Sequence, residues 1–519
     1  MPSLPFHLMQ TRSHVLKALV SDNVPNGGDD RTSKRTLSRW KFPTSIDAST
    51  RKAIVSASLF VLFDVLFRKL FVRLNLSFPS SLAGCALLFT FLLVLPERLS
   101  ESVFALLEPG ALLIGAKWLP VFFVPSLVTL PLTDPLGSTA ELVKTALVVV
   151  GGFLFTLVST AYSVVAVRKL VESTEKQGQD KINSSSSSSS SSNKLESDIM
   201  KKMRGDSKAT TAGKESLTRT KQQLTSAPAQ PLPKAFSDEL FHSLLAITLF
   251  TGVGSVATSI LRVGSVLPKR ISALFLLSST LTSFVFGARL PKKLTKIVHP
   301  LVTCTALTWT AASALAIVRG KSFRSILRSY RTGSLSPLTT GAGDILLFLL
   351  GPAVVSLAIS MYSRRKLMAD NLPAVATGVG VSTFGGIFGT ALAVRLLDMG
   401  NPMLRLALLS RNITSPLAMT IASIIGADVS LAVSMVVVTG LIGANFGASL
   451  LSLLRIKDPV ARGLGIGAAA HGLGTAAFAN EMDAFPFAAI AMALTGAAAT
   501  VTVSIPVLRR IILQLALGC

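Results

Sequence analysis

The sequence predicts an all-α polytopic membrane protein with about twelve transmembrane helices in two blocks, and with broken or re-entrant helices in the C-terminal block. Three observations carry this prediction. Half of the 519 residues are hydrophobic. Only 15% are charged, whereas soluble proteins have about 25%. The apolar residues gather in runs close to the roughly 20 residues that a helix needs to cross a bilayer, without the alternation typical of membrane strands.

The charge distribution indicates a lipid environment rather than a nucleic-acid partner. The net charge is +25, from 51 Lys and Arg against 26 Asp and Glu. The basic residues lie mainly in the N-terminal tail, in a polar linker and at the ends of apolar runs. Anionic headgroups and the positive-inside rule produce that pattern, so we expect membrane lipids and no nucleic acid as partners. The three cysteines are far apart and form neither a metal motif nor a disulfide framework.

The first 170 residues divide into a tail and a membrane block. Residues 1–52 form a polar, basic tail that is either a cleaved transit peptide or a disordered extension, and it lacks the apolar core of a secretory signal. Residues 53–170 hold four apolar runs, which predict four spanning helices. Pro120, Pro125 and Pro131 should break the third of them, because proline cannot continue a helix.

A second, larger block follows a change of composition. Residues 171–235 include a serine tract and mixed charges, which predict a disordered linker. An even number of spans before it would place tail and linker on the same side of the membrane, in agreement with their shared basic charge. Residues 236–519 hold nine apolar runs, at about 240–261, 271–288, 297–318, 345–361, 373–397, 404–425, 429–454, 460–479 and 485–507.

Two segments of the second block carry a specific resemblance. They are GDILLFLLGPAVVSLAISMYSRRK, from Gly343, and VVVTGLIGANFGASLLSLLRIKDPVARGLGIGAAAHGLGTAAF, from Val436. Both resemble the LrgB membrane family. The first block, with FPSSLAG at Phe78 and KWLPVFFVPSLVTLPL at Lys117, is similar to the smaller LrgA partner. The resemblance covers nearly all of the chain except the tail and the linker.

A fusion of an LrgA-like and an LrgB-like block is similar to the plastidal glycolate/glycerate translocator family of photosynthetic eukaryotes. The resemblance implies a secondary transporter that moves small 2-hydroxy acid anions across the plastid inner envelope membrane in photorespiration, by proton coupling or by exchange. Bacterial relatives have instead been linked to murein hydrolase regulation and cell lysis. A holin/antiholin-like protein that regulates membrane permeability or cell death is therefore the alternative function.

Arg411 is the strongest candidate for binding an organic anion. It lies inside the apolar run 404–425, where a charge costs at least about 2.5 kcal/mol and should face a cavity or a counter-charge. Its guanidinium fork suits a carboxylate. Pro416 predicts an interruption before it, so that a half-helix starting near Ser415 would direct free N–H groups at an anion. We include the neighbouring Asn412 and Thr414 in the predicted site. The alternatives are a structural arginine paired with Asp344 or Asp428, and an arginine that snorkels to an interface.

His471 is the candidate for proton coupling. It lies in the Gly/Ala-rich stretch GIGAAAHGLGTAAF, whose flexible HGLGT could break a second helix. An imidazole titrates near pH 6.5, so it could carry a proton or bind a carboxylate, although it could equally be a packing residue. Gly472, Gly474 and Thr475 belong to the same predicted site. Asn445 could bind a substrate hydroxyl or act as a contact between helices.

Asp344 has two interpretations. It could be an N-terminal helix residue favoured by the helix dipole, or a carboxylate that exchanges protons or balances Arg411. A cation/proton antiporter would need paired intramembrane carboxylates, for which only Asp344 and Asp428 are near candidates. The sequence contains no nucleophile–base arrangement, phosphate loop or metal cluster, so we expect no enzyme activity, no cofactor and no metal. The oligomeric state, including a homo-oligomer, stays open.

Overall fold

The computed structural model describes residues 48–76, 78–133, 137–186, 236–261, 266–291, 294–295, 298–336 and 339–518. From Ser49 onward these residues belong to one compact unit. All regular elements in these ranges are helices, which confirms the all-α prediction. The predicted tail lies outside the described residues up to residue 47, and the predicted linker does so from residue 187 to 235.

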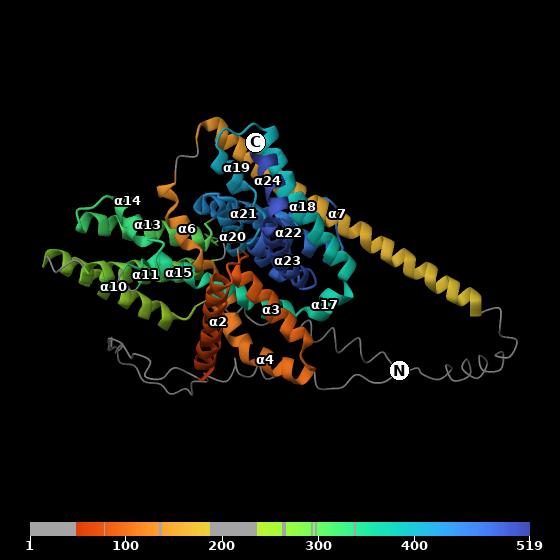
Figure 1. Ribbon diagram of the computed structural model, residues 1–519, viewed down its shortest axis with the longest axis horizontal. Coiled ribbons are helices and arrows are strands. Elements are labelled where there is room, and N and C mark those ends of the chain that lie inside the picture. The colour runs from red at the N-terminus through yellow and green to blue at the C-terminus, as the bar shows by residue number, and fades with distance from the viewer. Residues whose placement is uncertain are drawn as a thin grey trace, which may run out of the picture. The chain divides into compact units, whose positions relative to one another are not determined.

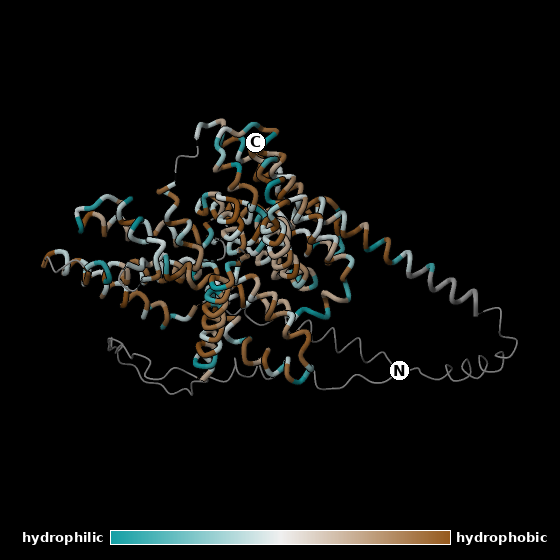
Figure 2. The backbone as a smooth tube through the Cα atoms, viewed as in Figure 1, coloured by the Kyte–Doolittle hydropathy of each residue, from teal (hydrophilic) through white to brown (hydrophobic). Residues whose placement is uncertain are grey.

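Eight helical segments in the described ranges are long and apolar enough to cross a bilayer. Their surfaces indicate contact with lipid, since Phe250 and Ile317 are 80% and 82% exposed. Figure 2 shows hydrophobic residues along most of the helices. The eight segments are the Thr139–Thr174 part of α7 (Thr139–Ser186), α10 (Asp238–Ile260), α11 (Val266–Arg289), α13 (Pro300–Val318), α15 with α16 (Ala342–Phe348 and Leu350–Tyr362), α18 (Leu372–Leu396), α21 (Val429–Leu453) and α23 (Phe485–Ser504).

The other helices are shorter, more polar or interrupted. Each of the remaining predicted runs coincides with at least one of them, except the third run of the first block, which forms shorter pieces. Helices α4, α14 and α17 lie outside the predicted runs, and α24 lies almost wholly outside them. These helices are α2 (Ala48–Arg73), α3 (Ser80–Val94), α4 (Glu97–Gly110), α14 (Phe323–Tyr330), α17 (Arg365–Asp370), α19 (Pro402–Leu408), α20 (Ser415–Ile425), α22 (Pro459–Ala477) and α24 (Pro506–Leu517).

Proline divides the third run of the first block, as predicted. After α4 the chain forms a π-helix over Ala111–Lys117, and then two short helices, α5 (Leu119–Phe122) and α6 (Val124–Val128). A 3₁₀ turn follows at Leu130–Leu132. Pro120, Pro125 and Pro131 each lie at the start of one of the last three pieces. Proline is tolerated there because the first N–H groups of a helix have no partner within the helix.

Several helices of the second block begin at a polar cap. The side chain of Asn401 accepts hydrogen bonds from the backbone at the start of α19, and Asp458 does the same for α22. Both caps precede a proline, which presets the first helical turn. Asp428 caps α21 in the same way. Such caps fix where a helix starts even when the flanking residues are uniformly apolar.

Helix α7 packs mainly against the second block. Phe153, Leu157 and Ala161 of α7 share a buried cluster with residues of α18, α21, α22 and α23. The cluster around α2–α6 instead contains residues of α10–α16. In Figure 1 the gold α7 lies beside α18 and the blue helices, and α10, α11, α13 and α14 lie together in green. Helix α7 also continues to Ser186, past the predicted start of the linker at residue 171.

Candidate functional site

The candidate site is centred on the interruption between α19 and α20. Helix α19 ends at Leu408 and α20 begins at Ser415, and the residues between them are not in a regular helix. This is the break that Pro416 predicts. Thr414 is the N-cap residue of α20, and its side chain makes no capping hydrogen bond. The segment therefore places polar side chains and a helix N-terminus inside the helix packing.

Arg411 is fully buried and its charge is largely unpaired. Its side chain is the largest of those less than 2% exposed among the described residues. Nη2 donates to Oγ1 of Thr156 on α7 at 3.3 Å, whereas Nε and Nη1 have no hydrogen-bond partner. The guanidinium lies against Gly152, one turn before Thr156, where a methyl group would overlap it. Burying an ion without a counter-ion costs several kcal/mol, so this arrangement favours an anionic ligand.

Neither carboxylate proposed as a structural partner of Arg411 contacts it. Asp344 accepts four hydrogen bonds, from the backbone of Thr332, Gly333 and Gly341 and from the Thr332 hydroxyl. It thereby caps α15, which matches its interpretation as an N-terminal helix residue and leaves the proton-coupling role without support from geometry. Asp428 accepts a hydrogen bond from Leu431 at the start of α21. Within the described ranges, no carboxylate forms an ion pair with Arg411.

Further unpaired polar atoms surround the same break. The amide of Asn412 donates to the carbonyl of Ala468 on α22 at 3.2 Å, but its Oδ1 has no partner. Asn412 lies against Gly386 of α18, where a methyl group would come within 3 Å of the amide. Of the eleven buried side-chain N and O atoms without a partner in the described part of the chain, eight lie on α7, α18 or the segment 410–412. Their residues are Glu141, Thr160, Thr383, Thr390, Ser410, Arg411 and Asn412.

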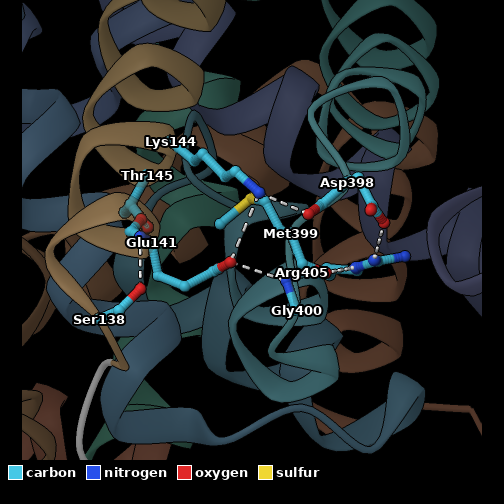
Figure 3. A network of polar contacts seen from close by, with 8 residues as sticks. All are labelled: Ser138, Glu141, Lys144, Thr145, Asp398, Met399, Gly400 and Arg405. Carbon is cyan, nitrogen blue, oxygen red and sulfur yellow. Dashed lines mark hydrogen bonds and ion pairs between the residues drawn. The ribbon is translucent and has the colours of Figure 1, made fainter.

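A polar clamp fixes the start of α7 against the α18–α19 turn (Figure 3). Lys144 donates to the carbonyl of Asp398 at 2.6 Å, and the backbone N–H of Gly400 donates to Glu141 at 2.8 Å. Arg405 of α19 forms an ion pair with the side chain of Asp398 and donates to the carbonyl of Met399. These contacts connect α19, the helix that precedes Arg411, to α7, whose Gly152 and Thr156 lie against the Arg411 side chain.

His471 lies in a distorted part of α22. Its backbone has φ 44° and ψ −138°, a conformation that a residue with a side chain adopts only at a cost of about 1–3 kcal/mol. Nε2 lies 2.8 Å from the carbonyl of Val436 on α21. A carbonyl can only accept, so Nε2 must carry the proton and Nδ1 is left for a second partner. No hydrogen bond joins His471 to Arg411 in the described ranges, and Ala468, the partner of Asn412, precedes His471 by three residues.

The other predicted residues differ in their positions. Thr475 donates to the carbonyls of His471 and, from α22 to α23, of Ala488. Gly474 packs against Ala470, and Gly472 is partly exposed beside Met492. These positions suit helix packing.

Thr414 and Ser415 are buried at the start of α20, next to the break. Asn445 is exposed and donates to the carbonyl of Leu441 on its own helix, so the structure does not bring it to the site.

Sequence reasoning missed the contribution of the first block. Gly152 and Thr156 could not be assigned, because nothing in the apolar run of α7 indicates which helix it faces. A second missed group had a visible signal. Asp64 lies in an apolar run of α2 and is fully buried, and Arg68, four residues later, donates to it at 2.6 Å. Arg68 also donates to the carbonyl of Phe348, at the junction of α15 and α16.

The arrangement can bind a small acid but offers little for covalent chemistry. A carboxylate at Arg411 could accept hydrogen bonds from Nε and Nη1 and would neutralise a buried charge. The Ser410 hydroxyl and Asn412 Oδ1 could bind a neighbouring hydroxyl group. The described residues contain no group of three or more His, Cys, Asp or Glu that could hold a metal ion.

The comparisons with known proteins identify the family of the chain. Residues 280–509 match the model of the LrgB-like family. That match includes the α19–α20 break and α22 but not α7. The chain is 34% identical over 471 residues to plastidal glycolate/glycerate translocator 1, chloroplastic, of Arabidopsis thaliana. The alignment covers 89% of this chain and 80% of that protein. No solved structure matches the chain. The chain therefore belongs to the LrgB-like family of membrane proteins and is a homologue of that translocator.

Proposed function

We propose that this protein is a secondary transporter for small 2-hydroxy acid anions, glycolate and glycerate, in the plastid inner envelope membrane during photorespiration. One observation carries the proposal, namely the fully buried guanidinium of Arg411, with Nε and Nη1 unpaired, at the break between two helices. The named substrates of the Arabidopsis relative fit that chemistry. Its chloroplast location supports the same compartment for this chain.

The substrate class follows from the groups at the break. Nε and Nη1 of Arg411 match the two oxygens of a carboxylate, which is the strongest geometry for that pair. Ser410 Oγ and Asn412 Oδ1 are buried and unpaired on either side of Arg411, so a hydroxyl group on the carbon next to the carboxylate finds partners there. The N-terminus of α20 adds partial positive charge. A monocarboxylate without the hydroxyl should bind less well.

The transport cycle would use the two distortions of the second block. We propose that the α19–α20 break and the kink at His471 divide two of about twelve membrane crossings, and that the LrgB-like block (236–519) moves against the LrgA-like block (53–170). Helix α7 supplies Gly152 and Thr156 to the site, so movement of α7 relative to α19 would expose or occlude Arg411. His471 would take up the coupling proton at Nδ1, since Nε2 is held by Val436.

Counterflow in liposomes tests this function. Purified protein is reconstituted with unlabelled glycolate inside, and uptake of labelled glycolate is measured against a panel of hydroxy and keto acids outside. We expect saturable uptake that glycerate inhibits and that acetate, with a carboxylate but no hydroxyl, inhibits much less.

The same vesicles distinguish the holin/antiholin-like alternative. A permeabilising assembly would release a large trapped dye without saturation and would not require internal glycolate. Dye release together with the absence of counterflow would refute the transporter.

A further inference from the structure

A polar pocket lies away from the α19–α20 break, where α11, α13 and α14 meet the loop before α15. Its volume is about 300 Å³, which is at the lower end of the range for small-molecule sites. Of its fourteen lining residues, four are basic, six carry a hydroxyl and none is acidic. The basic residues are Lys269, Arg270, Arg319 and Lys321. None of the four forms an ion pair with a described carboxylate.

Helix dipoles explain only half of this charge. Arg319 and Lys321 follow the C-terminus of α13, where cations are favourable. Lys269 and Arg270 lie near the N-terminus of α11, whose first turn has no acidic residue. Cations are unfavourable at that end of a helix. An anion between the two pairs would offset both the mutual repulsion and the unfavourable position on α11.

One hydrogen bond holds the Arg319 side chain in place, but not all of its donors have a partner. Its Nη2 donates to the carbonyl of Pro268, in the first turn of α11, at 2.6 Å. Its Nε is buried and has no hydrogen-bond partner. Burial also lowers the pKa of Arg319, which is the direction expected for a cation without a counter-charge. The contact with Pro268 bridges the two helices and orients the guanidinium at the pocket.

The remaining wall is rich in hydroxyl groups. Ser325 and Ser329 of α14 line the pocket together with Thr332, Thr339 and Thr340 of the following loop. Asp344, which does not line the pocket, accepts two hydrogen bonds from Thr332 and two from the backbone of Gly333 and Gly341. Basic residues at a membrane surface often only extend towards the headgroups. That explanation predicts basic side chains that are dispersed along the surface. These four instead line one pocket together with serine and threonine hydroxyl groups.

We propose that this pocket binds a phosphate-bearing polyol, as a soluble phosphate ester or as the headgroup of an anionic phospholipid. The phosphate accepts hydrogen bonds from the four cations, and the serine and threonine hydroxyls bind the polyol. This site is separate from Arg411 and does not depend on the transported substrate.

Ligand-induced stabilisation in nanodiscs tests the pocket. The full chain in discs of phosphatidylcholine is titrated with glycerol 3-phosphate, and its melting temperature is followed. The test variant is Arg270→Gln with Lys321→Gln, at two exposed side chains, so that folding is preserved. The control is Lys366→Gln, an exposed lysine outside the pocket. We expect at least a tenfold weaker interaction in the test variant, because one hydrogen bond to a charged group is worth about that factor.

A second arm identifies the source of the phosphate. The protein is extracted from discs that contain phosphatidylglycerol, and retained lipid is counted by native mass spectrometry. Retained phosphatidylglycerol that is lost in the double variant but kept in Lys366→Gln identifies a lipid headgroup, while saturable stabilisation by glycerol 3-phosphate alone identifies a soluble ester. Equal binding by the double variant and the control, or binding of neither probe, overturns the proposal. Arg411→Met should leave the shift in melting temperature caused by glycerol 3-phosphate and the retention of phosphatidylglycerol unchanged, so failure here is distinct from failure of the transport site.

Discussion

Replacing Arg411 by methionine separates a substrate-binding arginine from a structural one. The substitution keeps an unbranched apolar stem and removes the guanidinium with its charge. Its structural loss is one hydrogen bond of 3.3 Å to Thr156, worth about 1–3 kcal/mol, and its gain is relief from a buried ion that no carboxylate pairs in the described ranges. We therefore expect stability that is unchanged or increased by up to about 4 kcal/mol.

Transport should change in the opposite direction. A carboxylate that loses a buried charged partner loses about 2–5 kcal/mol, which corresponds to about a 30- to 5,000-fold fall in kcat/KM. Arg411→Lys should recover little, because an ammonium group cannot form the two-pronged contact. Thermal melting in detergent and glycolate counterflow in liposomes are measured on the same preparations.

Arg462→Met is the matched control. Arg462 donates to both oxygens of Glu481, at 2.8 and 2.7 Å, so its removal leaves a carboxylate without its partner. This variant should lose about 1 kcal/mol of stability and keep transport. If Arg411→Met melts far below the wild type while the remaining folded protein transports normally, Arg411 is structural and the reasoning is refuted.

Three other predictions concern Gly152, His471 and His299. Gly152→Ala should displace the Arg411 guanidinium and reduce transport roughly 100-fold, whereas Gly151→Ala, which meets nothing within 4 Å, should not; equal effects would contradict the close approach. His471→Asn keeps a donor but cannot titrate, so uptake driven by a pH gradient should vanish while counterflow at equal pH persists; pH-driven uptake that survives would exclude His471 as the proton carrier. Burial lowers the pKa of His299, the cap of α13, from 6.5 to about 4. The unfolded chain therefore binds this proton first, and stability should fall by about 3 kcal/mol from pH 7 to pH 4. His299→Asn should reduce that slope in melting curves, and an unchanged slope would contradict the assignment.

Local signals in the sequence predict much of the fold. Each long apolar run coincides with at least one helix, because a lipid-exposed backbone must satisfy its own hydrogen bonds. Pro416 and the three prolines after Lys117 predict breaks that the structure contains, since proline removes a donor and clashes with the preceding turn. Arg411 stands out because a charge inside an apolar run needs an explanation wherever the run lies.

The sequence does not predict in the same way which side of a helix faces its neighbours or which polar side chains pair. Thr156 and Gly152 look like ordinary residues of an apolar helix, and their role follows only from the packing of α7 against the second block. Asn445 occupies an equally apolar run but faces outward. The sequence does not predict this orientation, because the 3.6-residue period of a helix gives little contrast when all of its sides are hydrophobic. The sequence allows two interpretations of Asp344, and only its four hydrogen bonds at the start of α15 distinguish them.

The distance between bound glycolate and Arg411 tests the central claim most directly. Glycolate labelled with ¹³C at its carboxylate is bound to protein labelled with ¹⁵N in arginine, reconstituted in lipid, and the ¹³C–¹⁵N dipolar coupling is measured by solid-state NMR. We predict strong dephasing, corresponding to a separation of about 4 Å or less for a two-pronged contact, that disappears in Arg411→Lys. Saturable glycolate binding without this dephasing, or with dephasing that survives in Arg411→Lys, would contradict the account.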